Sequence, residues 1–307
     1  MNYFFYILYQ NILPLTIMIA IGAVMYRIFK LDIKTLSKLN FYVFSPVLVF
    51  VKLYESTLSY AVMIQVIAFF ILFLAAIVLM VEVVIRIKRY QGGMKSAMRN
   101  SVIFYNSANY AIPLNQMVFV GDSFTLSIQI IIMMFQSLIP NTYGVYSVNA
   151  HKSNLKDIFK TIIGMPVIYA IPLAIVLRML HAPIPEPVNI PLQYIVNGFM
   201  VTALITLGVQ LGSMKWNFDF SSVILSNFLR LCMGPVIGFL IVWALGIEGI
   251  MAKALILSCA VPTSLSSVLL AVEYDNEPEF SAQAVFTSTI LSMFTVTLVI
   301  YLLQFVP

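Results

Sequence analysis

Long apolar stretches, separated by short polar loops, follow one another along the whole chain. A helix needs about 20 predominantly apolar residues to cross the hydrocarbon core of a bilayer. The pattern predicts ten membrane-spanning helices, at residues 7–29, 36–53, 61–87, 97–120, 126–148, 158–180, 191–211, 220–245, 252–272 and 281–305. The second is diluted by Ser37, Lys38, Asn40 and Pro46, so we expect it to face other helices more than lipid.

Two of these predicted helices are interrupted near their middle by a proline among small polar residues. Pro113 lies in the segment 106–114 (NSANYAIPL), and Pro262 lies in the segment 258–267 (SCAVPTSLSS). A proline inside a helix removes one backbone hydrogen bond and clashes with the carbonyl four residues earlier. At membrane depth such broken helices occur only where they are buried in protein or line a watery cavity. The sequence therefore predicts two broken helices, restarting at the prolines, that form a transporter's binding site.

The spacing of the two prolines indicates an internal repeat. Pro262 follows Pro113 by 149 residues, close to half of the 307-residue chain, and each lies in the fourth span of a five-span half. Because five is odd, the second half must insert upside down relative to the first. We expect an all-α integral membrane fold of two inverted five-helix repeats, residues 1–150 and 151–307.

Composition supports the membrane assignment and excludes several other classes. The chain is 61% hydrophobic and 9% charged, against roughly 25% charged for an ordinary soluble domain. Residues 7–29 are too long for the core of a signal peptide, so we expect them to remain as the first span. With two cysteines inside spans and only His151 and His181, no metal or cofactor is expected.

The basic residues report orientation rather than nucleic-acid binding, although the net charge is +5. Cytoplasmic loops of membrane proteins carry an excess of Lys and Arg. If both termini lie outside the cytoplasm of a cell membrane, the cytoplasmic loops hold 13 of the 17 basic residues: Arg27, Lys30, Lys34, Lys38, Arg86, Lys88, Arg89, Lys95, Arg99, Lys152, Lys156, Lys160 and Lys215. Only Lys52, Arg178 and Lys253 then lie outside. We expect the loop residues also to contact anionic membrane lipids.

Several segments give the chain a family resemblance. They are residues 106–114, 206–212 (TLGVQLG), 261–264 (VPTS) and 272–274 (VEY), followed by a Ser/Thr-rich last span from Thr287. In these segments the chain resembles the auxin efflux carrier family, which includes bacterial malonate and malate carriers and the plant PIN-type auxin exporters.

This resemblance implies a particular architecture. The fourth and ninth spans would cross at their broken centres, spans 3 to 5 and 8 to 10 would form a mobile transport domain, and spans 1, 2, 6 and 7 would form a scaffold that often dimerises. The related bile-acid sodium symporters carry an acidic residue in the ninth span near their sodium sites. This chain has Ser and Thr there, which argues against sodium coupling.

The polar residues at the two interruptions are the candidate substrate-binding residues. Backbone N–H groups at a restarting helix, and the positive end of its dipole, favour a carboxylate. The candidates are Asn106, Asn109, Tyr110, Pro113, Ser258, Pro262, Thr263, Ser264, Ser266 and Ser267. Alternatively, these groups only repair the loosened backbone.

Two ionisable residues lie within predicted spans and are functional candidates for that reason. Glu82 lies near the inner end of the third span, and Arg230 lies deep in the eighth. They could form an ion pair, Glu82 could extend to the inner surface by itself, or either could couple transport to an ion.

These features together favour a secondary transporter of a small organic anion, a mono- or dicarboxylate or an auxin-like acid, that works by an elevator motion. The alternatives are a sodium-coupled bile-acid-type symporter and a membrane sensor that binds a ligand without transporting it. No G-x-x-x-x-G-K-[ST] motif is present, so ATP use by this chain is not expected. An enzyme is not expected either, because neither His lies in a span and no acidic pair is visible.

Overall fold

The computed structural model describes residues 2–56, 58–148, 163–214 and 220–307, and this part of the chain is helical without a β-strand. Seven of its helices are long and apolar enough to cross a membrane: Tyr3–Phe29, Ile33–Tyr54, Tyr60–Lys88, Ser123–Gly144, Glu186–Ser213, Ser221–Ala244 and Pro278–Leu303. An all-α membrane fold is therefore confirmed.

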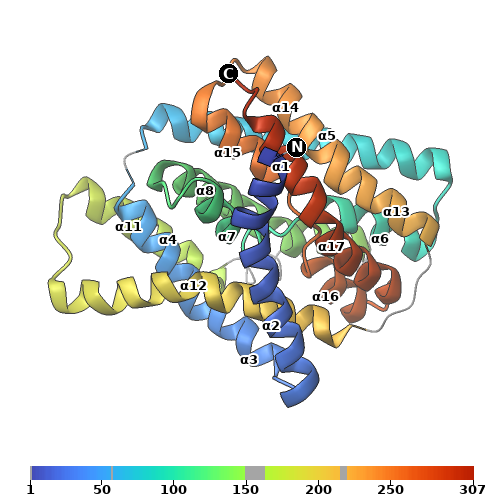
Figure 1. Ribbon diagram of the computed structural model, residues 1–307, viewed down its shortest axis with the longest axis horizontal. Helices are drawn as coiled ribbons and strands as arrows, with labels where there is room; N and C mark the ends of the chain where they lie inside the picture. Colours follow the sequence, from blue (N-terminus) through green and yellow to red (C-terminus); the bar gives the residue numbers. More distant parts are fainter. Residues whose placement is uncertain (1, 57, 149–162, 215–219) are drawn as a thin grey trace.

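The first half of the chain contains α1 to α9 (Figure 1). Short π-helical turns, labelled η, join some of these segments into continuous helices. In chain order they are α1 (Asn2–Ile7), η1 (Leu8–Ile12), α2 (Leu13–Phe29), α3 (Ile33–Leu39), η2 (Asn40–Phe44), α4 (Ser45–Tyr54), α5 (Tyr60–Lys88), α6 (Gly92–Ile103), α7 (Ala111–Val118), α8 (Ser123–Ile139), η3 (Pro140–Gly144) and α9 (Val145–Val148).

The second half is likewise built from α-helices, two of which are joined by a π-helical turn, η4. Its elements are α11 (Val167–Met179), α12 (Glu186–Ser213), α13 (Phe220–Phe228), η4 (Leu229–Met233), α14 (Gly234–Ala244), α15 (Gly249–Cys259), α16 (Ser266–Glu273) and α17 (Pro278–Leu303). The start of the predicted sixth span, together with Lys152, Lys156, Lys160 and Lys215, lies outside the described residues.

Both predicted interruptions are present. The predicted fourth span is divided into α6 and α7, and the predicted ninth span is divided into α15 and α16. The helices do not restart at the prolines, however, so that detail of the prediction is wrong. Helix α7 begins at Ala111, with Pro113 in its first turn, where a missing N–H costs little. Helix α16 begins at Ser266, four residues after Pro262, which lies in the interruption itself.

One helix begins earlier than the sequence predicts. Helix α12 starts at Glu186, whereas we expected a start at Pro191. Pro187 lies in the first turn of the helix, which tolerates proline, so the chain is already helical when it reaches Pro191.

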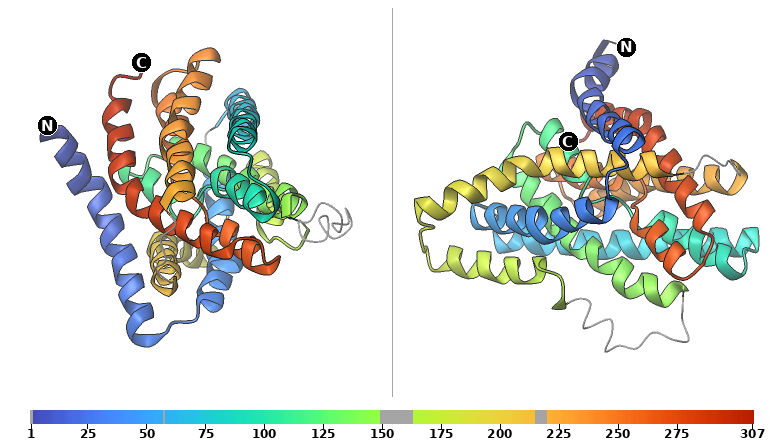
Figure 2. Two further views of the ribbon diagram at one scale, coloured as in Figure 1. Left: turned by 90° about the vertical axis from the view of Figure 1, so that its right-hand side faces the viewer. Right: turned by 90° about the horizontal axis from the view of Figure 1, so that it is seen from below.

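Helices α2 and α12 cross in very close contact (Figures 1 and 2). A Cβ atom at Gly208 would lie 2.0 Å from the carbonyl oxygen of Ile19, and a Cβ atom at Gly22 would lie 2.2 Å from that of Ile205. Gly212 similarly faces Ala23. Small residues that allow two backbones to approach are the usual basis of tight helix packing in membranes.

The two ends of the chain lie at the same end of the molecule, where α1 runs beside α17 (Figure 1). The rings of Tyr3 and Tyr301 are 6.1 Å apart there.

At the opposite end of the first long helix, the Asp32 side chain accepts hydrogen bonds from the backbone N–H groups of Lys34 and Thr35. The Thr35 hydroxyl also donates to this carboxylate. That bond has the largest effect, and together with the backbone bonds it holds the pKa of the Asp32 carboxyl below its ordinary value. Asp32 thus caps α3.

Candidate functional site

The two helix interruptions bind directly to each other through their backbones. The N–H of Asn106 donates to the carbonyl of Pro262 at 2.8 Å, and the N–H of Ser264 donates to the carbonyl of Phe104 at 2.7 Å. Tyr105 and Thr263 therefore form an antiparallel bridge, here called the backbone bridge, between residues 104–106 and 262–264. Each interruption supplies hydrogen-bond partners that the other has lost from its helix.

Hydroxyl groups around the backbone bridge bond to further backbone atoms. The Thr263 hydroxyl donates to the carbonyl of Ser101 at 2.8 Å, and Ser288 of α17 accepts from the Thr263 N–H at 3.2 Å. The hydroxyls of Ser258 and Ser267 donate to the carbonyls of Leu255 and Ser264. These contacts are the backbone repair that the sequence left as an alternative for such groups.

A cavity of about 460 Å³ lies beside the backbone bridge. Four of the predicted binding residues line it, namely Asn106, Asn109, Ser264 and Ser266. Ser107 of the first interruption also lines it, and further polar residues come from other elements: Ser37, Lys38, Asn40, Ser45, Gln136, Ser137 and Gln210. Apolar residues such as Phe41, Met133 and Leu269 make up most of the remaining lining. The cavity thus joins both interruptions to α3, η2, α8 and α12.

The hydrogen bonds at the first interruption fix the direction of one side-chain amide. The backbone N–H of Asn109 donates to Oδ1 of Asn106 at 3.1 Å. Because an N–H can only donate, the oxygen of Asn106 must be the acceptor, and its NH₂ group remains to donate to a ligand. At the second interruption, the Ser264 hydroxyl accepts from the Ser266 N–H at 3.3 Å.

The electrostatics of the cavity favour a negative charge. Helix α7 begins two residues after Asn109, and α16 begins at Ser266, so the positive ends of two helix dipoles lie near the cavity. Lys38 is the one charged residue among the described residues that line it.

Comparison with known families gives a match over residues 7–300 to the membrane transport proteins, which form the auxin efflux carrier family. The chain belongs to this family. A search of curated proteins found no match. The resemblance predicted from the sequence is confirmed, and the protein is a multi-pass membrane transporter from a family of transporters rather than enzymes.

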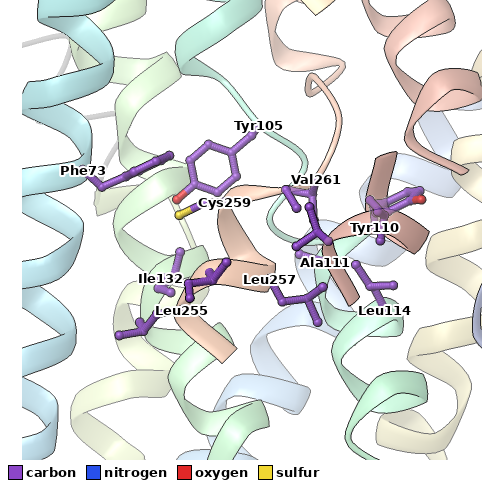
Figure 3. Packing of buried hydrophobic residues seen from close by; sticks show 14 of the residues in the cluster. Phe73, Tyr105, Tyr110, Ala111, Leu114, Ile132, Leu255, Leu257, Cys259 and Val261 are labelled. Atoms are coloured by element: carbon purple, nitrogen blue, oxygen red, sulfur yellow. The ribbon is translucent and has the colours of Figure 1, made fainter. Parts of the chain in front are cut away.

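Six predicted binding residues of this transporter do not line the cavity: Tyr110, Pro113, Ser258, Pro262, Thr263 and Ser267. Tyr110 is buried, and its hydroxyl is hydrogen-bonded to the Ser292 hydroxyl of α17 at 2.9 Å. Figure 3 shows Tyr105 and Tyr110 pointing away from each other, Tyr105 toward Phe73. Tyr105 lines the cavity.

Glu82 and Arg230 do not form the ion pair that the sequence left open as one of three alternatives. Glu82 pairs instead with Arg99 of α6, whose Nη1 also donates to the Ser147 hydroxyl at 3.2 Å. We placed Arg99 near a loop, but α6 begins at Gly92, so Arg99 lies inside this helix and opposite α5. Arg230 lies elsewhere, with its guanidinium against backbone carbonyls.

Sequence reasoning did not select Lys38, Asn40, Gln136 or Gln210 as binding residues, although all four line the cavity. Asn40 is almost fully buried and donates to the Thr206 hydroxyl at 2.7 Å. For Lys38 and Asn40, the polarity of the second predicted span was the available signal. Among the described residues, no three His, Cys, Asp or Glu side chains come together as a metal site would require.

Proposed function

We propose that the protein is a secondary transporter of a small organic anion, which binds in the cavity beside the backbone bridge. The observation that carries this proposal is the kind of polar group in a lining that is otherwise largely apolar. Asn106 and Asn109 face the cavity, Lys38 contributes a positive charge, and no Asp or Glu is among the described residues that line it.

Magnitudes support an anion over a cation. A negative charge near a helix N-terminus gains about 0.3 to 1 kcal/mol when exposed, and up to about 2 kcal/mol when partly buried. Two such termini lie near the cavity, because α7 begins two residues after Asn109 and α16 begins at Ser266. A cation in the same place would be desolvated without a carboxylate partner, which is costly.

We further propose an elevator mechanism. In it, α5 to α9 and α13 to α17 form the transport domain, and α1 to α4, α11 and α12 form the scaffold. The cavity is lined by residues from both groups, and the backbone bridge ties the two interruptions within the first group. The inverted repeats 1–150 and 151–307, and a homodimer formed through the scaffold helices, belong to the same proposal.

A second cavity supports access from one side of the membrane. It has a volume of about 500 Å³, shares Gln210, Leu265 and Leu269 with the first cavity, and reaches Met214 and Glu279. Met214 directly follows α12, and Glu279 lies in the first turn of α17. The distribution of Lys and Arg supports the proposal that this is the cytoplasmic side of a cell membrane, with both termini outside.

A competition experiment tests the proposal. Three groups of compounds are tested on purified protein: the acids malonate, malate and indole-3-acetate, their amides, and amines of similar size. Each compound is tested for thermal stabilisation of the protein and for displacement of whichever of the three acids, radiolabelled, binds. We expect at least one acid to bind better than its amide and the amines not to bind. Amides that compete as well as the acids would contradict an anion site. If an acid does bind better than its amide, uptake of that acid into proteoliposomes establishes whether it is transported.

A further inference from the structure

Arg230 is a buried positive charge at the meeting point of the two interrupted helices. Its side chain is 0% exposed, and it lies in η4, the π-helical turn between α13 and α14. Nε donates to the carbonyl of Val261 at 3.1 Å, Nη1 donates to that of Val102 at 3.3 Å, and Nη2 donates to that of Cys259. These carbonyls lie at or just past the carboxyl ends of α6 and α15.

The surrounding residues leave space for the guanidinium. A Cβ atom at Gly234, one turn after Arg230, would lie 3.0 Å from Nη2, so a side chain there would crowd the group. The rings of Tyr105 and Phe73 lie 4.7 Å and 5.8 Å from the central carbon of the guanidinium. An aromatic face stabilises a cation at such distances. Arg230 therefore occupies a site built for a guanidinium.

The charge of Arg230 has no carboxylate partner within the described part of the chain, where the ion pairs are Lys52 with Glu55 and Arg99 with Glu82. Instead it faces the carbonyl ends of two helices, which carry partial negative charge. At each interruption the negative end of one half-helix lies near the positive end of the next. Arg230 offsets the negative ends of α6 and α15 and leaves the positive ends of α7 and α16 unopposed.

We propose that Arg230 is a specificity-determining residue that makes the cavity selective for anions without touching the substrate. This inference rests on the proposed function. Tyr105 connects the two places, because its ring packs against the guanidinium and the residue is one of those that line the cavity. Arg230 thus supplies positive potential from behind the backbone bridge, while the lining amides and N–H groups supply the hydrogen bonds.

The size of the effect follows from the geometry. A carboxylate that contacts Tyr105 in the cavity lies roughly 9 Å from the guanidinium, which is the 4.7 Å between the guanidinium carbon and the ring centre plus about 4 Å for the contact with the ring. At an effective dielectric constant of about 20, a unit charge at that distance changes the affinity for another unit charge roughly tenfold. The affinity for an uncharged amide of the same shape does not gain this tenfold factor, because the amide carries no net charge.

The experiment compares the affinity for malonate with that for malonamide, the uncharged amide of the same skeleton, in purified protein that elutes as a single folded species. Arg230→Met should lower the acid-over-amide preference about tenfold, and Arg230→Lys, which keeps the charge, should retain most of it. Arg178→Met is the matched control, because Arg178 donates to the Leu58 carbonyl and lies outside the cavity lining. It should leave the preference unchanged.

A second pair of variants keeps Arg230 in place, in case Arg230→Met does not fold. Phe73→Glu puts a carboxylate beside the guanidinium and should lower the preference, whereas Phe73→Gln should not. An unchanged preference in folded Arg230→Met, or in folded Phe73→Glu, would overturn the role of Arg230 while leaving the anion transporter intact. If the wild-type protein binds malonate no better than malonamide, and the other acids no better than their amides, the proposed function itself fails.

Discussion

At the scale of single residues, Lys38 supplies the charge of the described cavity lining. It is exposed, and it lies on α3, whose first turn is held by the Asp32 cap. An ammonium group at the mouth of a binding site raises the local concentration of an anion, and salt screens this effect. Lys34 lies one turn earlier on the same helix and does not line the cavity, so the two residues form a matched pair.

We expect Lys38→Gln to weaken carboxylate binding about two- to fivefold at low salt, the range typical of an exposed ion pair. Lys34→Gln should change the affinity much less. Titration of both variants and the wild type with the same acid, at low and high salt, measures the difference. Equal losses in the two variants would mean that position in the cavity does not matter.

Asn109 and Tyr110 are neighbours with different surroundings. Asn109 lines the cavity, whereas the Tyr110 hydroxyl is buried against Ser292. Asn109→Ala should weaken binding by about 1 to 3 kcal/mol, because a buried ligand group loses its partner. Tyr110→Phe should leave the affinity within about twofold and should affect thermal stability instead. Isothermal titration of both folded variants distinguishes these effects, and wild-type affinity in Asn109→Ala would exclude contact with the substrate.

The sequence allowed part of this site to be predicted. Asn106, Asn109, Ser264 and Ser266 adjoin an interruption, which proline chemistry makes visible in the chain. Gln210 could not be found in that way, because α12 reaches the cavity only through tertiary packing. The partner of Glu82 was missed for a related reason, because Arg99 meets it only through the packing of α6 against α5.

At the scale of elements, the contact between α2 and α12 leaves almost no room for change. Gly208→Ala would place a Cβ atom against a backbone oxygen of α2, which no side-chain rotation can relieve. We expect a loss of about 1 to 3 kcal/mol in stability, as for other overpacked interfaces. Gly198→Ala, on the same helix, meets only the ring of Phe44, which can shift, and should be milder. Thermal unfolding in one detergent compares the two, and equal losses would contradict this reading.

The interruptions were the elements easiest to predict and their exact limits the hardest. Proline marks where a helix cannot continue unchanged, but it is tolerated in a first turn, so Pro113 and Pro187 lie inside helices. Contact between residues 104–106 and 262–264 came from the family resemblance rather than from local sequence. Backbone pairing across more than 150 residues leaves no local signal.

At the scale of the whole molecule, the proposed orientation predicts which side of the membrane each loop faces. Gln91, between α5 and α6, should be cytoplasmic, and Gln304, after α17, should be outside. Single cysteines at these exposed positions should react with a membrane-impermeant reagent from opposite sides. The unmodified chain, with Cys232 and Cys259, is the control for background labelling. Labelling of residue 91 only from outside would reverse the topology.

The backbone bridge has a consequence for how such a transporter can diversify. Its two inter-helix hydrogen bonds use only main-chain atoms, which nearly every amino acid provides. Side chains that line the cavity, such as Asn109 and Ser266, can therefore be exchanged one at a time while this joint stays in place. Descendants of one ancestral carrier can then acquire new substrates through single substitutions, while the backbone bridge between the two interruptions is kept.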